Sequence, residues 1–157
     1  MRMQATSIAV GAALLVACAS PAAAQSANGA TIYNRCAACH TATGAGVPGA
    51  YPPLGVDFRQ MAAKPDGRRY LVAVVTRGLA GPLTVDGKSY RGVMPAQAGL
   101  NDASIAAVLN HVGSKIATTG PAFRLFTEAE VAKHRASAAD LNGAAVAKLH
   151  AYLRGAK

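Results

Sequence analysis

The feature that most constrains this chain is a cysteine pair followed at once by histidine, Cys36-Ala37-Ala38-Cys39-His40. Thioredoxin-like redox sites also contain C-x-x-C, but they need a surrounding βαβ pattern, and none is visible. A zinc site needs further ligands at metal spacing, and the other histidines stand far apart, at His111, His134 and His150. C-x-x-C-H is the attachment signature of c-type haem. We therefore expect one covalently bound haem c.

Covalent attachment explains the spacing of the motif. The two thiols add across the two vinyl groups of the porphyrin, and two intervening residues let both sulfurs reach one edge of the macrocycle. His40 is then placed below the iron as its proximal ligand. The chain has 157 residues, of which only 5% are aromatic and none is tryptophan, so its own core is thin. The haem would be the largest apolar object inside a single small domain.

The second axial position of the iron needs another side chain. After the first 24 residues the chain has two methionines, Met61 and Met94. Met94 lies in a segment rich in glycine and proline, 54 residues after His40, which is far enough for the chain to reach the other face of the haem. We predict that Met94 is the sixth ligand. Met61 is interpreted as core filler, and His111, on an apolar helix face, as a core histidine.

Several local segments resemble class I cytochrome c, the family of small mono-haem electron carriers. They are the attachment motif, the axial methionine segment Gly92-Val93-Met94-Pro95, and the proline–x–leucine segment in Tyr51-Pro52-Pro53-Leu54. The resemblance covers about residues 28–117 and implies an all-α fold of about three core helices and long loops around one haem. It also implies that the Pro52 carbonyl accepts the Nδ1 proton of His40 and that Leu54 packs on the macrocycle. His111 stands where this family more often has an aromatic ring against the N-terminal helix.

Residues 1–24 have the pattern of a secretory signal peptide. Arg2 precedes an uncharged apolar run over residues 8–17, and Ala22-Ala23-Ala24 is an A-x-A-type cleavage site. This pattern predicts export to the periplasm and a cytochrome domain over residues 25–118. Leu15-Val16-Ala17-Cys18 also resembles a lipoprotein box. Lipidation of Cys18, which would attach the protein to the membrane, therefore stays open as an alternative.

Apolar periodicity and capping residues predict three helices in the cytochrome domain. The first covers residues 28–39, the second runs from an Asp66 N-cap to Gly78, and the third follows an Asn101 N-cap. Residues 72–76 could be a strand by composition, but the cap signals at both ends favour a helix. Five glycines and two prolines predict a loop over residues 78–99. Residues 58–64 have only weak helical character.

A C-terminal extension follows over residues 119–157. Thr127-Glu128-Ala129-Glu130 is typical of a capping box and predicts a helix to about residue 136. A second helix is expected over residues 142–153. These helices either cover apolar surface of the cytochrome domain, which we favour, or form a docking element for a partner subunit.

Histidine–methionine ligation would leave no open position for substrate, so the resemblance implies outer-sphere transfer of single electrons. The donor would be a dehydrogenase or respiratory complex, and the acceptor an oxidase or reductase. Sixteen Lys and Arg against seven Asp and Glu give a formal charge of +9, which favours redox partners with an acidic docking surface. Nucleic acid is not expected as a partner. A subunit of a membrane-associated dehydrogenase complex is an alternative, and a haem enzyme or gas-binding protein would require that Met94 does not bind iron.

Overall fold

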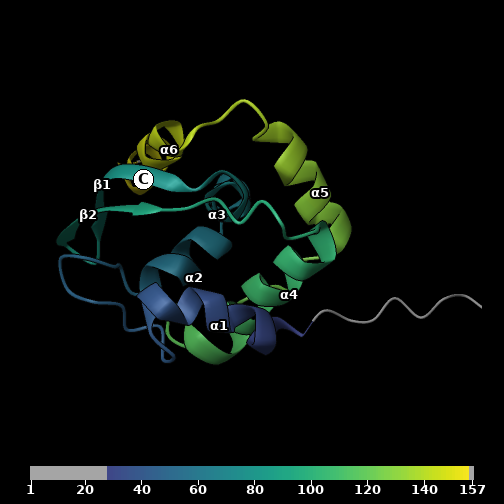
Figure 1. Ribbon diagram of the computed structural model, residues 1–157, viewed down its shortest axis with the longest axis horizontal. Helices are drawn as coiled ribbons and strands as arrows, with labels where there is room; N and C mark the ends of the chain where they lie inside the picture. The colour runs from purple at the N-terminus through teal and green to yellow at the C-terminus, as the bar shows by residue number, and fades with distance from the viewer. Residues whose placement is uncertain (1–27, 156–157) are drawn as a thin grey trace, which may run out of the picture.

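The computed structural model describes residues 28–155, and within them helices dominate (Figure 1). The elements in chain order are α1 (Gly29–His40), α2 (Val56–Ala62), α3 (Pro65–Arg77), β1 (Leu79–Val85), β2 (Lys88–Met94), α4 (Asp102–His111), the π-helical turn η1 (Val112–Ile116), α5 (Glu128–Ser137) and α6 (Gly143–Gly155). The helical fold class that the sequence predicts is confirmed. The predicted signal peptide, with Cys18, lies outside the described residues.

The first and third predicted helices, α1 and α4, pack directly against each other. Asn28 caps α1, because its side chain accepts hydrogen bonds from two backbone N–H groups of the first turn. Gly29 lies so close to α4 that a Cβ atom there would stand 2.2 Å from the carbonyl oxygen of Ala107. The Tyr33 ring lies 5.4 Å from the His111 imidazole, centroid to centroid. His111 therefore supplies a ring to the contact where the resemblance places an aromatic residue.

The second predicted helix, α3, begins differently from the prediction. Lys64 is its N-cap and Pro65 its first helical residue, so the predicted Asp66 N-cap is wrong. Proline suits this position because its φ is already helical and it lacks the N–H that would be unpaired. The helix ends at Gly78, as predicted, with φ +73°. The short helix α2, which precedes it, is not among the three predicted helices.

The predicted loop over residues 78–99 is wrong for most of its length. Residues 79–94 form an antiparallel hairpin in which Leu79 pairs with Met94 and Val85 with Lys88. Asp86 and Gly87 form the turn, with φ +48° and +75°. Two consecutive positive φ angles match the two-residue turn whose twist suits a hairpin. The Asp-Gly pair beside alternating apolar residues is the signal for this hairpin in the sequence.

The two C-terminal helices pack on the rest of the fold. In Figure 1 α5 lies beside α4, and α6 lies over the hairpin; α5 also contacts α3, and α6 contacts both β1 and α3. Arg68 of α3 is 3% exposed and donates a 2.8 Å hydrogen bond to Glu130 of α5. The predicted capping box is half present. Thr127 Oγ1 accepts the Glu130 N–H, but the Glu130 carboxylate binds Arg68 and Arg124 instead of the N-cap backbone.

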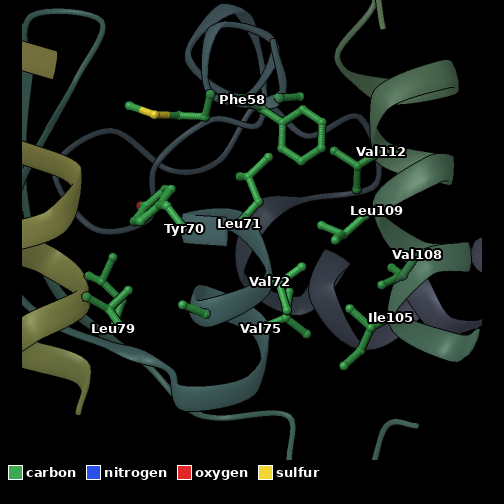
Figure 2. Packing of buried hydrophobic residues seen from close by; sticks show 14 of the residues in the cluster. Phe58, Tyr70, Leu71, Val72, Val75, Leu79, Ile105, Val108, Leu109 and Val112 are labelled. Atoms are coloured by element: carbon green, nitrogen blue, oxygen red, sulfur yellow. The ribbon is translucent and has the colours of Figure 1, made fainter. Parts of the chain in front are cut away.

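The hydrophobic core forms where α3 lies between the hairpin and α4. Figure 2 shows four residues of α3, Tyr70, Leu71, Val72 and Val75. They lie between Leu79 of β1 on one side and the apolar stripe of α4 and η1 on the other. Within residues 28–155 no helix is both long and apolar enough to cross a membrane.

Candidate haem site

All six residues that the sequence singles out for haem binding line one pocket. Cys36, Cys39 and His40 come from α1, Pro52 and Leu54 from the following loop, and Met94 from the end of β2. The rest of the lining is mainly apolar and comes from every helix and strand before residue 113, whereas α5 and α6 contribute none of it. Most of the core side chains labelled in Figure 2 also face this pocket. The pocket is thus a cleft in the core that an apolar group would fill.

His40 is held in the orientation that a metal ligand needs. Its side chain is buried, and its Nδ1 lies 2.8 Å from the carbonyl oxygen of Pro52. Because a carbonyl can only accept, Nδ1 carries the proton and Nε2 is left with a free lone pair. Burial lowers the pKa of His40 below its ordinary value, and the bond to Pro52 only partly offsets this. The ring is therefore neutral at pH 7, the form that binds metal.

The two cysteines are placed for a shared attachment. Cys36 and Cys39 are free thiols on α1 and both are half-buried. A separation of three residues puts them on the same face of a helix. Burial raises the pKa of the Cys36 thiol, an effect that the nearby Arg35 charge opposes and Cys39 reinforces. Both cysteines line the pocket beside His40.

Met94 is brought into the pocket by the hairpin and by the end of α3. Its partner across the sheet is Leu79, the first residue of β1. A Cβ atom on Gly78 would stand 2.5 Å from the Met94 carbonyl oxygen, so only glycine allows this close approach at its positive φ. The chain after Met94 is tied back by a 2.8 Å hydrogen bond from the Gln97 backbone N–H to the Val75 carbonyl oxygen. These contacts therefore fix the backbone at Met94.

The other residues considered as ligands lie elsewhere. Met61 is 1% exposed in the core and does not line the pocket. His111 packs on Tyr33, and it too is absent from the lining. The sequence interpretation missed Asp57 and Tyr70, two buried polar residues that do line it. No sequence motif marks them, since each looks like an ordinary residue of an amphipathic helix.

Comparison with known proteins agrees with this geometry. A family model described as cytochrome c matches residues 26–115. The chain belongs to the cytochrome c family. It is 46% identical over 112 residues to cytochrome c-552 of Thermus thermophilus, a match that covers 70% of this chain and 86% of that protein. It has the same 46% identity over 112 residues to a second cytochrome c-552 sequence from Thermus thermophilus, of which the match covers 76%.

Membership of this family means that the cofactor is covalently bound haem c. The residues present fit it, because an apolar pocket holds two free thiols, an oriented neutral imidazole and a thioether. When bound, the haem supplies an iron that cycles between Fe(II) and Fe(III) and so carries one electron. This cytochrome c is an electron carrier rather than an enzyme.

Proposed function

We propose that this cytochrome c is an exported one-electron carrier in which His40 and Met94 bind the haem iron and Cys36 and Cys39 hold the porphyrin. The observation that carries the proposal is the convergence of all four side chains, from α1 and β2, on one apolar pocket. With His40 and Met94 both bound to the iron, no coordination site would be left for a substrate. The electron would then pass without bond making or breaking at the iron.

The support around the ligands favours fast electron transfer. The Pro52 carbonyl fixes the tautomer and plane of His40 and makes the ring a stronger donor. The backbone contacts of Gly78 and Gln97 fix the position of Met94. A site that moves little between oxidation states needs little reorganisation when the electron arrives. The thioether ligand also favours Fe(II), so we expect a midpoint potential toward the high end of the range for haem proteins.

Partners dock, in this proposal, at the mouth of the pocket. Two apolar side chains of the pocket lining reach solvent there, since Val93 is 71% and Tyr51 39% exposed. Three exposed cations lie on α1 and β2, the elements that carry the proposed iron ligands, namely Arg35 on α1 and Lys88 and Arg91 on β2. An apolar contact beside positive charge suits an acidic redox partner. We propose that these partners are a donor dehydrogenase or respiratory complex and an acceptor oxidase or reductase. They would meet this protein in the periplasm, to which residues 1–24 would direct it as a signal peptide.

The ligand set is tested by optical spectra of protein exported with the haem-maturation machinery. Wild type should give a low-spin spectrum with the weak far-red sulfur-to-iron band, and carbon monoxide should leave it unchanged. Met94→Ala should lose this band and bind carbon monoxide, whereas the matched core variant Met61→Leu should behave as wild type. A wild-type protein that binds carbon monoxide, or a Met94→Ala protein that keeps the band, overturns the proposed ligation.

The docking surface is tested by electron exchange with small charged reagents. Oxidation of the reduced protein by the ferricyanide anion should slow as ionic strength rises, and oxidation by a cobalt-complex cation should accelerate. Lys88→Gln with Arg91→Gln should weaken both dependences, while Lys148→Gln on α6 should not. Equal salt dependence in the two variants would show that the charge near the pocket mouth does not guide the encounter.

A further inference from the structure

A buried histidine–carboxylate pair joins the C-terminal extension to the wall of the haem pocket. Asp57 of α2 is 6% exposed, and His150 of α6 is 1% exposed. His150 Nε2 lies 3.0 Å from Asp57 Oδ2. His150 stands outside residues 26–115, the part that matches the family. The extension therefore does more than cover apolar surface, because it adds a titratable group to the core.

Asp57 connects this histidine to the site of electron transfer. Asp57 and Tyr70 both line the pocket, whereas His150 does not. His150 contacts each of them, and its ring centroid lies 5.2 Å from that of Tyr70. The second carboxylate oxygen, Asp57 Oδ1, is buried and accepts no hydrogen bond among the described residues. Arg154 Nη1 approaches it to 3.4 Å, within ion-pair range. A carboxylate thus stands between the imidazole and the space that the haem occupies.

Packing alone does not explain these two residues. Burying a carboxylate and an imidazole costs free energy that an apolar pair of similar volume would avoid. In an interior with an effective dielectric constant of about 20, charges interact far more strongly than in water and are little screened by salt. The charge of this pair and the charge of the iron therefore influence each other.

We propose that His150 is a proton-linked positioning residue of this cytochrome. Its affinity for a proton rises when a donor delivers an electron to the iron, so that proton binding from solvent accompanies the arrival of the electron and proton release accompanies its departure. Protonated His150 neutralises Asp57, and so offsets the negative charge that faces the reduced haem. The inference rests on the haem site proposed above and extends it to a residue of α6.

The other groups around His150 do not take this role. Tyr70 stays neutral, because burial and the negative charge of Asp57 raise the pKa of its hydroxyl. Arg154 on α6 and Lys64, whose Nζ binds the Leu153 carbonyl oxygen, are permanent cations at neutral pH. The β1 strand that packs on α6 has no titratable side chain. Histidine is the side chain that ordinarily titrates between pH 5 and 8.

The test measures the midpoint potential of the loaded protein from pH 5 to 9. In wild type the potential should fall as pH rises across this range. A proton affinity about tenfold higher in the reduced protein corresponds to a total fall of about 59 mV. His150→Gln and Asp57→Asn should abolish this fall. His134→Gln is the matched control, since His134 pairs with a carboxylate on α5 but lies away from the haem pocket, and it should keep the fall.

A second measurement uses wild type only and so does not depend on the variants folding. The His150 ring resonance, followed by NMR, should titrate at higher pH in the reduced protein than in the oxidised one. The inference is overturned if the two titrations coincide, if the wild-type potential does not change with pH, or if His150→Gln keeps the full change. An unaltered low-spin spectrum in His150→Gln separates these results from a failure of the proposed ligation.

Discussion

Replacing Glu130 with glutamine measures how strongly one ion pair holds the C-terminal helices to the rest of the fold. The Glu130 side chain is 16% exposed and receives Arg68 and Arg124. The hydrogen bond from Arg68, the main cause, and the charges of both arginines lower the pKa of Glu130 from 4.5 to about 2. At about 1.4 kcal/mol per pKa unit, this lowering corresponds to at most about 3 kcal/mol, and screening by solvent around the exposed Arg124 reduces it to about 2 kcal/mol of stability at pH 7.

The sign of the pH dependence follows from the lowered pKa. A carboxyl whose pKa is lower in the folded protein stabilises it above the unfolded pKa, and the stabilisation is lost as pH falls toward 2. Denaturant unfolding of the haem-loaded proteins should therefore give Glu130→Gln about 2 kcal/mol less stability than wild type at pH 7. The difference should shrink between pH 4.5 and 2, because protonated Glu130 then resembles glutamine.

A control on the same helix isolates the ion pair. Glu128 is exposed in the first turn of α5, so Glu128→Gln should cost only a few tenths of a kcal/mol. The reasoning fails if Glu130→Gln loses less than about 1 kcal/mol at pH 7. It fails equally if the loss is the same at pH 2, because the anionic charge would then not be its source.

Three further substitutions test packing and backbone geometry through unfolding free energies. Gly29→Ala should destabilise by more than about 2 kcal/mol, because its Cβ would overlap the Ala107 carbonyl. The control Gly99→Ala, which has open space around it, should be nearly neutral. Equal effects would refute the close approach of α1 and α4. Met61→Ala should cost about 2–5 kcal/mol as a core cavity and leave the far-red band intact, and a lost band would place Met61 at the iron. Gly87→Ala should cost about 1 kcal/mol from its positive φ alone, and a neutral result would argue against the hairpin turn.

Local features of the sequence predict most of the helices correctly, and the exceptions have local reasons too. Asn28, Asn101 and Thr127 cap the helices that follow them, because a capping side chain binds backbone N–H groups two or three residues away. The predicted start of α3 is wrong because Pro65 defines the first turn without a capping side chain. Glycine and proline content predicts a loop over residues 78–99, whereas the Asp86-Gly87 turn chemistry indicates the hairpin that forms there.

The sequence alone predicts the haem attachment site, because the chemistry needs two thiols and an imidazole within five consecutive residues. The pairs that join α5 and α6 to the core could not be predicted in this way. Glu130 meets Arg68 across 62 residues, and His150 meets Asp57 across 93. Neither contact leaves a periodic or spaced signal, since each depends on how whole helices pack. Spacing along the chain determined what is bound, and tertiary packing decided which buried charges stand beside it.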